Sequence, residues 1–207
     1  MGRIKEISRK PVHRRKRNPV VYLICEGTKT EIRYFKGFRS RGCHIDIIPI
    51  PSQYKAADHL VRKTRATMGT APYYPDEGDV IWCVFDRDDN TDMALRNAKQ
   101  TAEREGYRLA YSNPSFELWF LLHFVDQKAA VIDPQAAVRM LKQPGRLEGY
   151  AKNQDLYTLL KPMQEKAIER AKRWICALTE EKAEIFCRQS DPVTTVVELV
   201  GYLNSKR

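Results

Sequence analysis

The sequence of 207 residues contains no long hydrophobic run. Its longest apolar stretches are Val20 to Cys25 and Leu118 to Phe120 continuing through Leu122, whereas a membrane-spanning helix needs roughly 18 residues or more. The basic N-terminus is not followed by an apolar segment or a small-residue cleavage site, so it does not resemble a secretory signal. We therefore expect a cytoplasmic protein with no membrane contact.

The cysteines also form no recognisable motif. The five cysteines make an odd count, with no CxxC pair and no histidine at zinc-finger spacing. Cys25 and Cys83 lie inside apolar runs, where a thiol serves as a small hydrophobic group. We expect all five cysteines to be structural: Cys25, Cys43, Cys83, Cys176 and Cys187.

Positive charge is unevenly distributed. The net charge is +10, and residues 1–18 hold eight Lys and Arg against one Glu, which leaves 28 basic and 25 acidic residues for the rest of the chain. A basic arm on a nearly neutral body favours a polyanion partner, although a solvated leader has the same composition. The candidate nucleic-acid contacts in the arm are Arg14, Arg15, Lys16 and Arg17.

Hydrophobic patterning predicts an α/β fold. Strands are expected at residues 20–25, 44–50, 79–85 and 107–111, and they alternate with helices at 28–39, 53–67 and 91–105. This order predicts a parallel four-stranded sheet with helices on both faces.

The second half of the chain has a helical pattern. Helices are expected at 114–124, 134–142, 154–161, 163–180 and 192–204, and Asp133-Pro134 and Asp191-Pro192 are predicted to be N-cap and first-turn pairs. The expected organisation is a flexible arm at 1–19, an α/β domain at 20–125 and a helical extension at 126–207 that packs on it.

Acidic residues follow two of the predicted strands. Glu26 follows the first strand, and Asp86 and Asp88 follow the third. The carboxyl ends of parallel strands meet at one edge of the sheet, and alternation by two places both aspartates on one side of an extended segment. Three carboxylates suit Mg²⁺ or Mn²⁺, and such an ion can activate water and neutralise charge on a phosphoryl group.

Each of these residues also has a purely structural interpretation. Asp89 or Asn90 can cap the third helix, and Glu26 can cap the first. Thr28-x-x-Glu31 has the spacing of a capping box, although Glu31 can equally serve a second metal. Lys29 can hold a substrate phosphate or pair with a carboxylate.

The segment from Ser112 to Trp119 follows the fourth strand. Asn113 or Ser112 is predicted as an N-cap with Pro114 in the first turn. An exposed helix N-terminus there can also bind phosphate, so Asn113 is a candidate nucleic-acid contact, and Glu117 can reach the metal pocket. His123 is expected to be a core histidine in preference to a catalytic base.

A loop carries two adjacent tyrosines, Tyr73 and Tyr74, downstream of Lys63 and Arg65. This combination can stack on and clamp a nucleic-acid strand. Ordinary surface packing is the alternative.

A glutamate-glycine turn after strand one and an aspartate-x-aspartate after strand three resemble a Toprim domain. The segments VYLICEGTKTEIRYFKGF, VIWCVFDRDDN and YSNPSFELWFLLHF resemble the RloB-like family, whose members are related to the Toprim part of OLD-type nucleases. The resemblance covers residues 20–125 and extends weakly through Tyr150, Lys152 and Asp191-Pro192.

The resemblance implies a bacterial defence context, near restriction or abortive-infection genes and often beside an AAA-type ATPase. The sequence has no Gly-rich loop followed by Lys and Ser or Thr, so such an ATPase would act in trans. The expected function is Mg²⁺- or Mn²⁺-dependent nucleic-acid hydrolysis by Glu26, Lys29, Glu31, Asp86, Asp88 and Glu117. A regulatory or binding module working with the ATPase, and a nucleotidyl or phosphoryl transferase, are the alternatives, and a homo-oligomer is left open.

Overall fold

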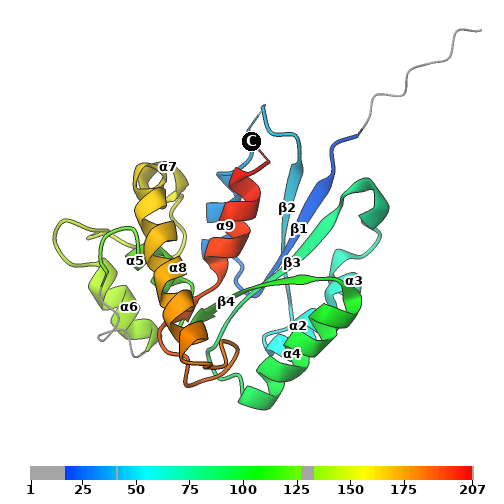
Figure 1. Cartoon of the computed structure of the whole chain (residues 1–207). Helices are drawn as coiled ribbons and strands as arrows, with labels where there is room; N and C mark the ends of the chain where they lie inside the picture. The colour runs from blue at the N-terminus through cyan, green and yellow to red at the C-terminus, as the bar shows by residue number, and fades with distance from the viewer. Residues whose placement is uncertain (1–16, 41, 127–132, 207) are drawn as a thin grey trace, which may run out of the picture.

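A computed structural model describes residues 17–40, 42–126 and 133–206. Its centre is a sheet with the strand order β2-β1-β3-β4-β5 (Figure 1). The first four strands in this order run parallel, and the short β5 runs antiparallel to β4. The strands are β1 (Val20–Cys25), β2 (Asp46–Pro51), β3 (Val80–Asp86), β4 (Arg108–Asn113) and β5 (Val193–Thr194). The predicted α/β class is confirmed, with one strand more than expected.

Helices cover both faces of the sheet and bury two separate apolar clusters (Figure 1). One face carries α2 (Ala57–Arg62), α3 (Thr64–Met68) and α4 (Asp92–Glu105). The other face carries α1 (Thr30–Lys36), α5 (Glu117–Leu121), α7 (Tyr157–Leu160), α8 (Gln164–Glu180) and α9 (Val196–Asn204), with α6 (Pro134–Leu141) against α5. Short 3-10 turns lie at Pro75–Glu77 and Lys161–Met163. Within the described residues, no helix is long and apolar enough to cross a membrane.

The edge strand β2 runs to Pro51, although the sequence predicts that prolines end it at residue 50. The backbone N–H groups of Asp46 and Ser52 donate to the carbonyls of Pro19 and Cys25 at 2.9 and 2.7 Å. Because successive residues of a strand point their N–H groups to opposite sides, Pro49 and Pro51 face away from β1. A proline there costs no ladder hydrogen bond, and it blocks the addition of a further strand.

The C-terminal segment differs from its prediction. The expected helix at 192–204 begins only at Val196, because Val193 and Thr194 pair with Asn113 and Ser112 as β5. The Asp191-Pro192 pair is therefore not a helix cap. Asp133 is a cap as predicted, since its Oδ1 accepts a hydrogen bond from the backbone N–H of Ala136 at 2.6 Å. The second half of the chain thus adds a strand to the sheet and shares its core.

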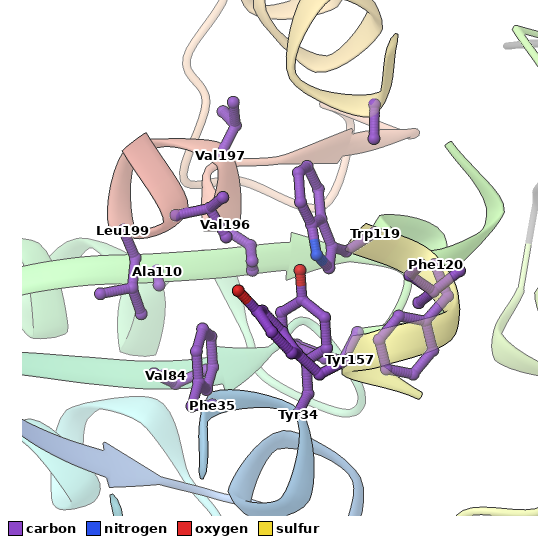
Figure 2. Close-up of a cluster of buried hydrophobic side chains, with 14 of the residues drawn as sticks. Tyr34, Phe35, Val84, Ala110, Trp119, Phe120, Tyr157, Val196, Val197 and Leu199 are labelled. Carbon is purple, nitrogen blue, oxygen red and sulfur yellow. The ribbon is translucent and has the colours of Figure 1, made fainter. Parts of the chain in front are cut away.

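Tyr34 is the centre of the core on the α1 face (Figure 2). Its ring centroid lies 5.3–5.9 Å from five other aromatic rings, and Gln164 Nε2 donates to its hydroxyl at 3.2 Å. These rings belong to Phe35, Phe38, Phe116, Phe120 and Tyr157. One side chain therefore joins α1 to α5, α7 and α8, the helices around the segments that follow β1 and β4.

Removing the Tyr34 ring should destabilise the fold strongly. We expect Tyr34→Ala to lower the free energy of unfolding by about 3–5 kcal/mol, as for other buried aromatic residues. Tyr34→Phe keeps the ring and should cost about 1 kcal/mol, since it removes only the hydroxyl's hydrogen bond. Urea denaturation of both variants measures this, and equal losses in the two variants would contradict the central role of the ring.

Candidate active site

A polar cavity of about 250 Å³ opens at the carboxyl ends of β1 and β3. Five carboxylates and three lysines line it: Glu26, Glu31, Asp86, Asp88, Glu117, Lys29, Lys55 and Lys152. The structure thus brings together all six residues that the sequence predicts as catalytic. Lys55 and Lys152 are additions to that set.

Glu26 joins the ends of two neighbouring strands. Its backbone N–H donates to the carbonyl of Val84 at 2.9 Å, and its Oε2 accepts from the backbone N–H of Asp86 at 3.1 Å. Lys55 Nζ donates to the Glu26 carbonyl at 2.7 Å. The Glu26 carboxylate therefore faces β3, which does not fit the alternative of a cap for α1.

Glu31 lies in the first turn of α1 and is buried. The helix begins at Thr30 after Lys29, so Thr28 is not its N-cap and the capping-box prediction is wrong. The Glu31 carboxylate instead turns back onto Gly27, where any Cβ would collide with both of its oxygens. Glycine at position 27 is needed for this close approach, which places Glu31 beside the other acids.

Asp86 and Asp88 reach the cavity by a different route from the predicted one. Asp86 is the last residue of β3, whereas Asp88 lies beyond the strand at φ +34°, a backbone conformation that aspartate tolerates better than most residues. The predicted alternation along an extended segment is therefore wrong, although both side chains line the same cavity. Strained backbone of this kind is often found at functional sites.

Asn90 fixes the turn that carries the two aspartates. Its Nδ2 donates to the Asp86 carbonyl at 3.0 Å, and its Oδ1 accepts from the backbone N–H of Ala57 at 2.8 Å. The cap of α4 is Thr91, which accepts from the N–H of Ala94, so neither Asp89 nor Asn90 caps that helix as predicted. Asn90 instead ties the acidic turn to the start of α2.

Glu117 enters the cavity from the start of α5 and is almost fully buried. Its two oxygens accept hydrogen bonds from the hydroxyls of Ser115 and Tyr150, both at 2.8 Å. Lys152 Nζ lies 3.7 Å from Glu117 Oε1, and the Lys152 side chain is 70% exposed. Lys152 can therefore turn toward a ligand at the cavity mouth.

Burial and crowding raise the pKa values of Glu26, Glu31, Asp86 and Asp88. Burial is the largest cause for each, and it raises the pKa of Glu26 to about 7 and that of Asp86 well above its usual range. For Asp86 the charges of Glu31, Glu117, Glu26 and Asp88 add to the effect. Burial also raises the pKa of Asp88 and of Glu31. These carboxylates repel one another, so a cation placed among them would stabilise their ionised forms.

The donors in this cavity suit a hard divalent cation. They are carboxylate oxygens, which Mg²⁺ and Mn²⁺ prefer and soft metals do not. Among the described residues, no three His, Cys, Asp or Glu side chains already lie in an arrangement that could hold a metal ion. Ligation by Glu26, Asp86 and Asp88 together would therefore need their side chains to rotate within the cavity.

Several predicted residues lie elsewhere. Asn113 is fully buried in β4, where its Nδ2 donates to the carbonyls of Cys187 and Arg188 at 3.3 Å, so it is neither a helix cap nor a surface contact. His123 is a core residue whose Nδ1 donates to the Trp119 carbonyl. Arg17 pairs with Glu77 and Asp79 at 2.5 and 2.8 Å. Arg14, Arg15 and Lys16 lie outside the described residues.

Lys55, Lys152 and Tyr150 line or support the cavity without having been assigned a role from the sequence. Lys55 lies just after β2, so the rule that directs attention to residues behind each strand end would have found it. Tyr150 and Lys152 lie in a loop far from any strand end, and only the folded structure brings them to Glu117.

The family model described as RloB-like protein matches residues 21–203, which is most of the chain. No curated protein and no solved structure matches the sequence.

The pKa of Glu26 leads to a prediction about stability. Between its usual value of 4.5 and about 7, folded Glu26 keeps a proton that the unfolded chain has released. The free energy of unfolding should therefore fall as pH rises from about 5 to 8, by at most about 3 kcal/mol from this group. Glu26→Gln should remove this contribution to the pH dependence of the free energy of unfolding. Urea denaturation in EDTA measures the difference between wild type and variant across this range, and parallel pH profiles would contradict the assignment.

Proposed function

The chain belongs to the RloB-like family, and we propose that it hydrolyses phosphodiester bonds in nucleic acid with the help of a divalent cation. The observation that carries the proposal is the cavity in which five carboxylates and three lysines meet at the carboxyl edge of the sheet. The acids suit a metal ion, and the lysines suit the phosphate that such an ion would act on. The family match by itself does not give an activity.

Glu26, Asp86 and Asp88 are the proposed ligands of Mg²⁺ or Mn²⁺. When bound, the cation would lower the pKa of a coordinated water and neutralise charge on the phosphoryl oxygens. Glu26 and Asp86 are held by the hydrogen bond between the Glu26 carboxylate and the Asp86 backbone. Asp88, at the more exposed end of the set, has the greatest freedom to adjust its position.

The lysines are proposed to bind the phosphodiester anion. Lys29, Lys55 and Lys152 come from three separate segments and surround the acids. Lys55 is oriented by the Glu26 carbonyl, and Lys152 lies near Glu117. Their positive charge offsets the repulsion that an anionic substrate would meet from five carboxylates, and it can stabilise the additional charge of the transition state.

Glu31 and Glu117 are proposed to position a second ion or the attacking water. Both are buried beside the other acids, and each is fixed by its surroundings, Glu31 against Gly27 and Glu117 by the hydroxyls of Ser115 and Tyr150. A fixed carboxylate is suited to hold a water molecule in one orientation. Tyr150 acts through Glu117 and is therefore a positioning residue.

We further propose the biological setting that the resemblance implies. It is a cytoplasmic role in bacterial defence, in which an AAA-type ATPase encoded nearby acts with this chain. This chain would then supply the hydrolytic site, and the ATPase would control its activity through nucleotide binding and hydrolysis. The same metal and phosphate chemistry would also serve a nucleotidyl or phosphoryl transferase, and the regulatory module stays an alternative prediction.

Hydrolysis of end-labelled DNA and RNA in Mg²⁺ or Mn²⁺ tests the proposal. We expect Glu26→Gln and Asp86→Asn to lower turnover by about 100-fold or more, because each removes a charge that the cation requires. Glu198→Gln is a matched control, since Glu198 is another acid whose pKa is raised by burial but lies on α9, away from the cavity. It should retain full activity.

The assay is run with and without the product of the neighbouring ATPase gene. Metal-dependent turnover that both cavity variants retain would contradict the assignment of the site. Wild-type protein with no turnover on any nucleic acid under either condition would contradict the hydrolytic function itself.

A further inference from the structure

A basic face extends along α2 and α3. Ala57, Leu60, Val61, Thr64 and Met68 are buried at helical spacing, which turns the opposite side of these helices to solvent. That side carries Arg62, Lys63 and Arg65, all exposed, which we call the basic ridge. None of the three forms an ion pair with a described residue, and the nearest acid on the helices is Asp58. The ridge is therefore a positively charged surface that faces solvent.

The ridge begins at the cavity. Lys55, two residues before α2, lines the cavity, and Asn90 fixes the start of the helix against the acidic turn. From Ala57 to Arg65 the chain rises by about 12 Å at 1.5 Å per residue. The guanidinium of Arg65 lies over the ring of Tyr73, 5.2 Å from its centroid. Basic side chains thus lie at both ends of α2 and α3, Lys55 at the cavity and Arg65 beside the tyrosine loop, with Asp58 between them.

The loop displays the next residue, Tyr74, in a fixed position. Tyr74 is 50% exposed, although its backbone N–H donates to Asp79 Oδ2 at 2.8 Å and its carbonyl accepts from the N–H groups of Glu77 and Asp79 at 3.0 and 3.2 Å. Arg17 lies 4.9 Å from the ring centroid and is itself held by Glu77 and Asp79. Such an exposed aromatic side chain is oriented by its surroundings before any ligand binds.

Asp79 makes this arrangement possible. Its side chain is fully buried, and it accepts hydrogen bonds from Arg17 and from the backbone N–H groups of Val20 and Tyr74. Burial alone would raise the pKa of Asp79, but these hydrogen bonds lower it. The loop therefore keeps an ionised anchor, and the sheet edge at the start of β1 and β3 supports it.

We infer that the basic ridge and Tyr74 form a track for single-stranded nucleic acid that leads into the carboxylate cavity. The inference rests on the proposed function and names the form of its substrate. Arg62, Lys63 and Arg65 would contact successive phosphates, and a base would stack on the free side of the Tyr74 ring. Interleaved positive charge and aromatic rings are typical of proteins that bind single strands without sequence preference.

The chemistry favours a single strand over a duplex. Stacking on Tyr74 requires a base whose face is free, and the bases of a duplex are stacked on one another. The cavity, with a volume of about 250 Å³, has room for the phosphodiester of one strand. DNA and RNA share both features, so the track should accept either.

Fluorescence titration in EDTA tests the track without any need for hydrolysis. The probes are labelled oligothymidylate and oligouridylate of about 16 nucleotides, the upper site size of a single-strand-binding domain, and a mixed-sequence DNA duplex of equal length. Wild type should bind both single strands more tightly than the duplex. Tyr74→Ala should weaken binding by about 5-fold or more, as expected for the loss of one stacked base, whereas Tyr74→Phe should bind like wild type.

The charge contribution is tested by salt dependence. Arg62→Gln/Lys63→Gln should flatten the slope of log affinity against log salt by about 1.4, since each phosphate contact on a single strand contributes about 0.7. Lys166→Gln/Lys172→Gln is the matched control, because it neutralises two exposed lysines of α8, which packs on the opposite face of the sheet. The control should keep the wild-type slope. Circular dichroism confirms that all variants are folded.

The track would be overturned by any of three results: equal slopes for the ridge and control variants, wild-type affinity in Tyr74→Ala, or preferential binding of the duplex. These results are independent of the hydrolysis assay. Tight, ridge-dependent binding without metal-dependent turnover would uphold the track and reject the nuclease. Metal-dependent turnover together with wild-type binding in Tyr74→Ala and in Arg62→Gln/Lys63→Gln would uphold the nuclease and reject the track.

Discussion

Repulsion among five carboxylates in a small, largely buried cavity is the constraint on which this structure depends. Acids at such spacing destabilise a fold unless protons or a cation neutralise them. The chain nevertheless holds them there with specific contacts: the Asp86 backbone on Glu26, the Gly27 turn on Glu31, and two hydroxyls on Glu117. These contacts hold the carboxylates close together and do not reduce their repulsion. We therefore interpret the cavity as a site that binds a cation.

The cavity and the Asp79 anchor lie at opposite ends of the same strands. The strands β1 and β3 end at the cavity, whereas the Asp79 anchor and Arg17 lie at the start of these two strands. Six residues of β1 span about 20 Å at 3.3 Å per residue. Arg17, where the described chain begins, therefore lies far from the acids, and the basic ridge on α2 and α3 runs between the two regions.

Local patterns in the sequence predicted the parts of the fold that depend on short-range physics. The buried strands, the alternation with helices and the position of the acids behind β1 and β3 follow from apolar runs and from the geometry of parallel sheets. Predictions failed where tertiary contacts decide. Pro49 and Pro51 stay in a strand because β2 is an edge, and Val193 and Thr194 form a strand because β4 leaves room beside Ser112 and Asn113. Lys152 and Tyr150 reach the cavity through a loop whose path no local pattern encodes.

The central claim is that the carboxylates bind a divalent cation. Crystals of the wild-type protein soaked in Mn²⁺ test it most directly, because an anomalous difference map locates the ion without reference to activity. We predict a peak within the cavity, coordinated by oxygens of Glu26, Asp86 and Asp88 at about 2.0–2.3 Å. A cavity without a peak at saturating Mn²⁺, with its acids instead paired to Lys29, Lys55 and Lys152, would contradict the account.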